Sequence, residues 1–475
     1  MKHIFYCILA VFFVAAISSC KEGKEGPAGK PGSVVTIGTD GFWYIDGNKT
    51  TYKAVGENGS TPSIGIDGYW YIDGIKTDYK ATGSTLSIGT DGYWYIDGEK
   101  TEYIAGVYSG DDMIIVAKYF SRINAEAMQL SVDFAKEVGA NQLLFFPDQI
   151  DESKYPGVAK ILNNSKIDLW LIAPTFYHDD NRSAAQIDDF GREPNWAICD
   201  DGEIAWENNG PAPHPSGSWV RFVCPNDHDY LDYRINYLKD ALRKCDFTGI
   251  SLDFMRYFVY WEGAYSFTDP KTFRNACFCD DCIAEFATIN STTTGGITTP
   301  LIIEGTTTVE KATFIKNKYF RQWTNYKCGK IDKTVEYVLS ELRKEFPNLK
   351  ANIHAVPWKN DGYGGAIKSI AGQDFALLSN RLDQITPMTY NFLVDRPASW
   401  INEVTSDVFN VVNGKIPVIP TIEVRGVSDS HYEAALTSAI KSPSSGVVIW
   451  RFEDITNRPA EASKREITER ILNNK

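Results

Sequence analysis

From about residue 111 to the C-terminus, short apolar runs alternate with amphipathic stretches. Eight runs have the length and composition of β-strands, at residues 113–118, 142–147, 169–177, 249–257, 351–358, 384–390, 417–424 and 446–452. Helical patterns lie between them, at residues 125–138, 230–244, 331–346, 398–412, 429–441 and 461–472. Eight strands that alternate with helices predict an α/β fold, a (β/α)8 barrel over residues 111–475. A doubly wound sheet is the alternative, but no glycine-rich phosphate loop follows the first strand.

The ends of the predicted strands are rich in carboxylates, histidines and aromatic residues. In a (β/α)8 barrel the carboxyl ends of the strands meet on one rim, which carries the functional residues. Histidines there can donate to sugar hydroxyls and aromatic rings can stack on sugars, although each could also be an interior residue. The predicted substrate-binding residues are Tyr177, His178, Arg256, His354, Trp358, Tyr390, Trp450 and Glu453.

Asp253 and Glu423, at the ends of strands four and seven, are the predicted catalytic pair. Cleavage of a glycosidic bond commonly needs one carboxyl group that protonates the leaving oxygen and another that attacks carbon or activates water. Either residue could instead be structural, with Asp253 paired to Arg256 and Glu423 paired to Arg425. The reserve candidates are Glu453 and Asp454.

Composition favours carbohydrate over nucleic acid as a partner. Lys and Arg number 48 against 61 Asp and Glu, which gives a net charge of −13, whereas phosphate recognition needs a local excess of cations. The 12 Trp, 25 Tyr and 25 Phe exceed the needs of a core and suit surfaces that stack on sugar rings. We therefore expect an oligo- or polysaccharide partner and no nucleic acid.

The N-terminus indicates export and lipidation. An apolar run over residues 4–17 has the length of a signal peptide core and ends in Ile17, Ser18, Ser19 and Cys20. This site resembles the bacterial lipobox, and the acid-containing residues 21–25 are similar to the surface-export signals of Bacteroidota lipoproteins. The resemblance implies a signal peptide over residues 1–20 and a lipid anchor on Cys20 at the outward face of the outer membrane. An ordinary secretory peptide with an incidental Cys is the alternative.

A tether and a repeat array precede the predicted barrel. Residues 21–33 are rich in Gly and lack core-forming residues, and residues 34–106 contain three copies of a unit centred on Trp43, Trp70 and Trp94. Each unit has DG turn dipeptides around a run of β-formers, which predicts a β-hairpin or three-stranded meander. The units resemble N-terminal modules of Bacteroidota surface lipoproteins. They could be rigid spacers or, if their tyrosines share an exposed face, a glycan platform.

Four cysteines have the spacing of metal ligands. Cys277, Cys279 and Cys282 lie in the sequence CFCDDC, and Cys224 is the upstream candidate for a fourth ligand of a tetrahedral Zn²⁺. The pattern resembles the structural zinc site of some barrel-fold β-galactosidases. Disulfides are equally reasonable outside the cytoplasm, and both interpretations stay open. Either one is structural, so we expect catalysis to need no cofactor.

Residues 224–257, together with CFCDDC, TPMTY and the Trp450 of strand eight, resemble the glycosyl-hydrolase-like barrel families of bacterial lipoproteins. In those families strand four ends in a pattern like GIHLDYIRY, and the similarity is most specific around Asp253 and Arg256. The resemblance covers about residue 111 to the C-terminus and implies a TIM-barrel glycosidase with Asp253 as the main catalytic candidate. Related barrel glycosidases usually carry Glu on both strand four and strand seven, so Asp253 leaves the division of roles open.

These features predict a surface glycoside hydrolase that acts on a polysaccharide or glycan through two carboxyl groups. The alternative is a noncatalytic glycan-binding lipoprotein on a degenerate barrel, in which the rim aromatics still bind sugar.

Overall fold

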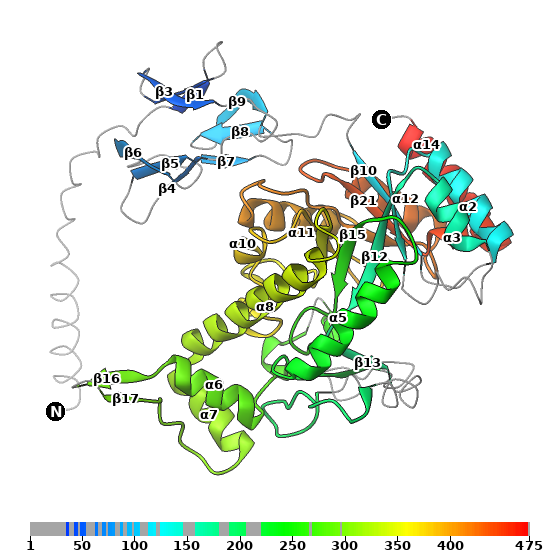
Figure 1. Cartoon of the computed structure of the whole chain (residues 1–475). Coiled ribbons are helices and arrows are strands. Elements are labelled where there is room, and N and C mark those ends of the chain that lie inside the picture. The colour runs from blue at the N-terminus through cyan, green and yellow to red at the C-terminus, as the bar shows by residue number, and fades with distance from the viewer. Residues whose placement is uncertain are drawn as a thin grey trace, which may run out of the picture. The chain divides into compact units, whose positions relative to one another are not determined.

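The computed structural model describes nine short strands between residues 35 and 104 and, beyond them, residues 113–119, 124–145, 157–179, 190–205, 220–265, 268–294 and 297–473 (Figure 1). Two compact units are present, residues 1–87 with 95–100 and residues 88–94 with 101–475. The predicted signal peptide, Cys20 and the tether over residues 21–33 lie outside the described residues. In the part of the chain that the structure describes, no helix has the length and apolar character needed to cross a membrane.

The N-terminal strands form three separate three-stranded sheets. In the first two sheets the strands pair antiparallel and in the same register, so that Trp43 lies opposite Ile37 and Trp70 lies opposite Ile64. The strands are β1 (Val35–Ile37), β2 (Phe42–Ile45), β3 (Asn48–Lys53), β4 (Pro62–Ile64), β5 (Tyr69–Ile72), β6 (Ile75–Lys80), β7 (Leu86–Ile88), β8 (Tyr93–Ile96) and β9 (Glu99–Ile104).

Eight parallel strands follow and form one sheet in chain order around a ring. They are β10 (Ile114–Lys118), β11 (Gln142–Phe145), β12 (Asp168–Pro174), β15 (Phe247–Asp253), β18 (Lys350–Ala355), β19 (Gln384–Pro387), β20 (Thr421–Glu423) and β21 (Gly446–Trp450). The ring closes where Ile385 of β19 bridges Val418: the Ile385 amide donates to the Pro417 carbonyl and the Ile419 amide donates to the Ile385 carbonyl, each at 2.9 Å. The predicted (β/α)8 TIM barrel is therefore confirmed.

Six helices match the predicted stretches: α2 (Ala125–Glu137), α5 (His228–Leu242), α8 (Phe320–Arg343), α11 (Ser399–Val411), α12 (Asp429–Ala439) and α14 (Ala462–Asn473). Side-chain oxygens of Asn124, Asp227 and Ser428 accept backbone amides and so fix the starts of α2, α5 and α12. The smaller helices are α3 (Val158–Asn164), α9 (Ala366–Ser369), α10 (Phe375–Leu378) and α13 (Phe452–Asn457).

The long segment between β15 and β18 contains structure that the sequence did not predict. It holds α6 (Asp280–Ile289), α7 (Thr308–Lys318) and a hairpin of β16 (Thr292–Thr294) and β17 (Ile297–Thr299). Helix α8 begins at Phe320, well before the predicted residue 331. Its added turns are stabilised by tertiary contacts, because Trp323 stacks on Phe278 at 4.7 Å and meets Phe286 edge to face at 4.9 Å.

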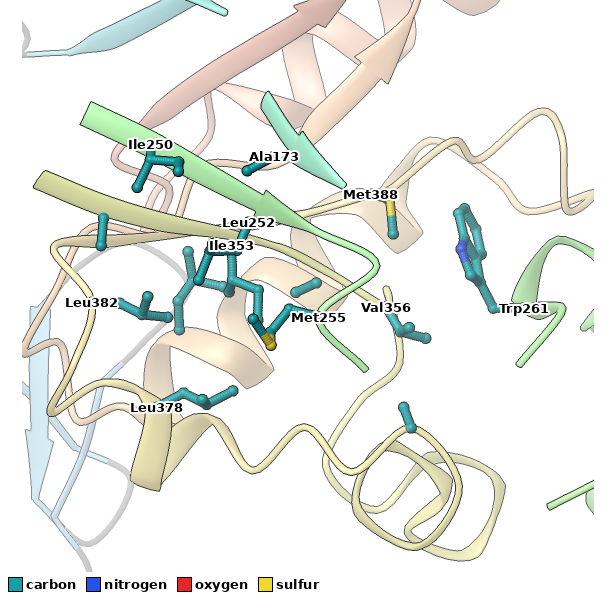
Figure 2. Close-up of a cluster of buried hydrophobic side chains, with 14 of the residues drawn as sticks. Ala173, Ile250, Leu252, Met255, Trp261, Ile353, Val356, Leu378, Leu382 and Met388 are labelled. Atoms are coloured by element: carbon teal, nitrogen blue, oxygen red, sulfur yellow. The ribbon is translucent and has the colours of Figure 1, made fainter. Parts of the chain in front are cut away.

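Side chains along each barrel strand alternate between the helix layer and the barrel interior. Figure 2 shows Ile250 and Leu252 of β15 and Ile353 of β18 in the buried cluster that contains Leu378 and Leu382 near α10. The interior positions toward the amino ends of the strands form a second apolar cluster of Val116, Leu144, Trp170, Ile172, Ile419 and Val448. Further along the strands, Lys118, Asp253, His354 and Glu423 occupy interior positions at the carboxyl end of the ring, whereas Gln142 and Gln384, at the amino ends of β11 and β19, bond to each other.

The apolar floor depends on a close contact between Gly249 and Trp170. These residues are partners in the β12–β15 pairing, and a Cβ on Gly249 would lie 2.5 Å from the Trp170 ring. We predict that Gly249→Ala lowers the free energy of unfolding by about 1–3 kcal/mol, because the Trp170 ring has no room to move in a packed interior.

Gly329→Ala is the matched control for this prediction, since no atom lies within 4 Å of a Cβ at that position of α8. This change should leave stability unchanged or raise it by up to about 1 kcal/mol, as Ala favours helix. Urea unfolding of both variants measures the difference. Equal effects of the two substitutions would contradict the proposed contact.

Candidate active site

Asp253 and Glu423 are the last residues of β15 and β20, and their alternation along the strands directs both into the barrel interior. Both side chains are buried, with 8% and 9% of each residue exposed. The two carboxyl groups therefore point to the same, carboxyl-terminal end of the ring, as the sequence predicted.

The Asp253 carboxylate is held at a sharp end of its strand. The Phe254 amide donates to Oδ1 at 2.8 Å, and Phe254 itself has a φ of 52°. Burial raises the pKa of Asp253, while the nearby cations Lys118 and Arg256 oppose this shift. Asp253 is thus a buried carboxylate whose negative charge is stabilised by two cations.

Lys118 is a residue of this site that the sequence analysis missed. It ends β10, has 3% of its surface exposed, and places Nζ 3.5 Å from Nδ1 of His354. Burial lowers the pKa of Lys118 to about 8, and the charge of Asp253 opposes this shift. The alternation of side chains along a strand could have identified Lys118. It lies two residues after Val116, so both side chains point to the same face, and that of Val116 lies in the interior cluster.

Arg256 supports Asp253 from the loop that follows β15. Its Nη1 donates to the Val259 carbonyl at 2.8 Å, and the guanidinium lies over the Phe222 and Phe254 rings at 4.9 and 5.3 Å. Only 2% of Arg256 is exposed, so this predicted substrate-binding residue is covered by protein. Its charge acts on Asp253 from within the loop.

Glu423 has no ion pair with Arg425, because Arg425 forms a bidentate pair with Asp454 at 2.7 and 2.8 Å. The Glu423 Oε1 atom is buried and has no hydrogen-bond partner among the described residues. Burial raises the pKa of Glu423 to about 7, while the Leu393 amide and the Arg451 charge oppose the shift. The Arg425 alternative for Glu423 is therefore wrong, and Glu423 is a carboxyl group poised to hold a proton near neutral pH.

Glu262 is a third carboxyl group with a raised pKa near the barrel mouth. Because it lies in a loop, the pattern of residues at strand ends did not identify it. It lies in a short 3-10 turn, Trp261–Gly263, in the loop after β15. Burial raises its pKa to about 7, with Arg256 opposing and Asp253 adding to the shift. Its Oε2 atom is buried with no hydrogen-bond partner in the described part of the chain.

Tyr390 links the three carboxyl groups. It is 6% exposed, stacks on Trp450 with 4.7 Å between ring centroids, and lies 5.8 Å from Trp261. Burial raises the pKa of Tyr390, and the charges of Asp253, Glu423 and Glu262 raise it further. The charges of β15, of the loop after it and of β20 thus all act on one phenol at the mouth of the barrel.

The other predicted residues divide between the mouth and its surroundings. His354 is fully buried, and burial lowers its pKa; Nδ1 lies 3.4 Å from Thr386 Oγ1. Trp358 packs on Phe273 at 5.0 Å and lines a cleft beside the mouth. Glu453 lies in α13, beyond the end of β21, and burial and the Glu453 charge both raise the pKa of Tyr119, which follows β10.

The predicted third strand ends earlier than expected. Residues 169–177 were predicted as one strand, but β12 ends at Pro174, and Tyr177 begins β13 (Tyr177–Asp179), which pairs with β14 (Val220–Phe222) in a separate sheet. The Tyr177 ring lies 4.7 Å from Phe254, the neighbour of Asp253. His178 lies on β13, and its side chain is outside the described ones.

Cys224, Cys277, Cys279 and Cys282 come together in a separate cluster. Their four sulfurs lie within 4.8 Å of one another, and Cys224 Sγ is 3.5 Å from the sulfurs of Cys279 and Cys282. These distances exceed the roughly 2.05 Å of a disulfide and fit the edges of a tetrahedron around a metal ion with bonds of about 2.3 Å. Backbone amides of Ile198 and Asn226 also donate to two of the sulfurs, which stabilises thiolate ligands.

Comparison with known proteins supports the fold. No protein-family profile matches the sequence, and no curated protein matches it either. Among the solved structures, the glycoside hydrolase domain of PgaB (BpsB) from Bordetella bronchiseptica has a TM-score of 0.51 at 10% identity, over 75% of this chain and 98% of that one. The catalytic domain of β-amylase from Paenibacillus polymyxa has a TM-score of 0.49 at 12% identity, over 77% and 100%. The chain thus has a TIM-barrel fold of the kind found in glycoside hydrolase domains.

The raised pKa of Glu423 predicts a pH-dependent gain in stability from Glu423→Gln. The pKa of Glu423 is about 7 in the folded protein against a usual 4.5. Below pH 4.5 the carboxyl group is protonated in both the folded and the unfolded state, so it costs no stability. As the pH rises to 7, it ionises more readily in the unfolded state, and the free energy of unfolding falls. At pH 8 the Gln variant should be more stable than wild type by about 1–3 kcal/mol, and at pH 5 nearly equal to it.

Thermal and urea unfolding at both pH values measure this effect, with Glu466→Gln on the exposed face of α14 as the control. The control should show no gain at either pH. A Glu423→Gln variant that gains nothing at pH 8 would show that Glu423 ionises without cost in the folded protein.

Proposed function

We propose that this protein is a glycoside hydrolase in which buried carboxyl groups at the barrel mouth cleave a glycosidic bond. The observation that carries the proposal is that Asp253 and Glu423 end two strands at the same end of the ring and are both buried there. Burial raises the pKa of both groups and of Glu262 in the loop after β15. Perturbed carboxyl groups in a barrel mouth are what acid and base catalysis of this reaction requires. The TIM-barrel fold is compatible with this chemistry.

The environments of the carboxyl groups suggest a division of roles. Asp253 has Lys118 and Arg256 beside it, which favour the ionised form that attacks the anomeric carbon or takes a proton from water. Glu423, with a pKa of about 7, can be protonated near neutral pH and can donate its proton to the leaving oxygen. Glu262 has the same property and is the competing candidate for the acid.

We propose a polysaccharide or oligosaccharide as the substrate, held by the Tyr390 and Trp450 rings that stack beside the carboxyl groups. The N-terminal sequence supports lipidation at Cys20 and attachment to the outward face of the outer membrane, with the repeat strands over residues 34–106 as a spacer. Catalysis by these side chains uses no cofactor.

We also propose that one structural Zn²⁺ binds the four clustered cysteines. Cys224 follows β14, and the other three lie at the start of α6, so the metal would tie the long insertion to the barrel. When bound, zinc supplies a tetrahedral cross-link that stabilises the folded chain.

Activity measurements test the assignment of the carboxyl groups. Asp253→Asn should reduce kcat by at least about a thousandfold on a glycan that the wild type cleaves, because it removes the group that attacks carbon or activates water. Of Glu423→Gln and Glu262→Gln, the one that removes the acid should also abolish the decline in rate above about pH 7.

A glycan-library digest with wild type and the three variants makes this test, with circular dichroism to confirm folding. If Asp253→Asn turns over normally, the proposed mechanism is wrong. If the wild type binds glycans but cleaves none, the barrel is a glycan-binding protein.

Metal analysis tests the zinc site. The purified chain should contain one zinc per molecule, and removal by a chelator should lower Tm by several degrees, because a cross-link within the fold is lost. Cys282→Ser should lose the metal, whereas Cys328→Ser, whose sulfur faces the Lys368 carbonyl outside the cluster, should keep it. The structure has seven free cysteines between residues 199 and 328. If the purified chain contains no metal and thiol titration finds fewer than seven thiols in this region, disulfides are favoured over the zinc site.

A further inference from the structure

A cleft of about 200 Å³ lies beside the barrel mouth, over the loops that follow β15, β18 and β19. Its walls include four aromatic residues, together with two cations and one acid: Trp261, Trp358, Tyr363, Trp400, Lys359, Arg396 and Glu403. The volume is below the usual range for drug-sized ligands and suits one sugar ring. None of the catalytic carboxyl groups lines this cleft.

Aromatic rings connect the cleft to the mouth. Trp261, which lines the cleft, lies 5.8 Å from Tyr390, and Tyr390 stacks on Trp450 at 4.7 Å. Trp261 also directly precedes Glu262 in the same short turn. The cleft and the mouth thus share a wall of packed aromatic side chains, so a glycan that extends from the mouth passes next to the cleft.

The charges in the cleft are unequal. Lys359 Nζ lies 3.8 Å from Glu403 Oε2, so these two charges offset each other. Arg396 forms no ion pair with any residue in the described part of the chain; its Nη2 donates to the Tyr363 hydroxyl at 2.8 Å, and its buried Nε has no partner there. Among the described residues, one guanidinium in the cleft is thus left without an ion-pair partner, in a chain whose net charge is −13.

Tyr363 fixes this guanidinium in place. The Tyr363 backbone has a φ of 50°, a costly conformation for a residue other than glycine. Its hydroxyl lies 3.0 and 3.2 Å from the Ala264 and Tyr265 carbonyls and accepts from Arg396. Tyr363 thus holds the Arg396 guanidinium in one orientation within the cleft. A guanidinium that is already oriented can bind a carboxylate through two parallel hydrogen bonds, which suits recognition of an anionic sugar ring.

We propose that this cleft is a subsite for a sugar ring that carries a carboxylate, with Arg396 as the residue that binds it. The inference rests on the proposed function and narrows its substrate class to glycans that contain uronic acid. Trp261 and Trp358, which are 1% and 3% exposed, form the floor of the cleft. The partly exposed Tyr363 contacts the ring, and Arg396 selects the charged sugar over the neutral one.

Binding measurements test this without any cleavage. Trisaccharides of galacturonate and of glucuronate, and their carboxyl-reduced neutral counterparts, are titrated by calorimetry into the full chain with Asp253→Asn, so that the probe is not consumed. We expect the chain to bind at least one of the two uronates. Its affinity for the neutral counterpart of that uronate should be at least about tenfold lower. Adding Arg396→Gln should remove this preference without changing the affinity for the neutral sugar.

Arg321→Gln is the matched control, because Arg321 is an exposed arginine of α8 that does not line the cleft; it should retain the preference for uronate. The proposal is overturned if neither uronate binds, if the charged and neutral sugars bind equally, if Arg396→Gln keeps the preference, or if a sulfated neutral trisaccharide binds in place of the uronates. A chain that binds uronate through Arg396 but hydrolyses no glycan would keep the subsite and exclude the hydrolase.

Discussion

The closed ring of parallel strands is the constraint on which the candidate site depends. Closure through the Ile385–Val418 bridge gives every strand an interior face, and strict alternation then decides which side chains share that interior. Toward the amino ends an apolar cluster packs around Trp170, and Gln142 and Gln384 bond to each other. At the carboxyl ends the interior positions carry Lys118, Asp253, His354 and Glu423, which have little access to water.

Burial of these groups has an electrostatic consequence. A carboxylate in a medium of low polarity is stable only beside a cation or a hydrogen-bond donor. Asp253 has both, whereas Glu423 and Glu262 have fewer compensating contacts and hold their protons to about pH 7. One enclosed mouth thus contains a carboxyl group with two cations beside it and others with fewer compensating contacts. This contrast supports the proposed division of catalytic roles.

Sequence reasoning identified the site as far as strand ends could identify it. Asp253 and Glu423 follow apolar β runs, so their place on the rim followed from the fold alone. Glu262 could not be found in this way, because it lies in a loop whose path depends on packing of Trp261 and Arg256. Glu453 lies beyond the eighth strand, because β21 ends at Trp450 and the next residues form α13.

The order of apolar and polar residues along the chain determined the eight strands, most of the helices and the barrel, because periodicity reports which faces are buried. The spacing of CFCDDC likewise indicated three cysteines that could act together. Only the tertiary structure decided that Cys224 completes the cluster, that the charge of Asp253 acts on Glu262, and that Arg396 lies in an aromatic cleft without an ion-pair partner in the described part of the chain. These facts depend on contacts between segments far apart in sequence, whose geometry is set by packing and loop closure and leaves no local pattern.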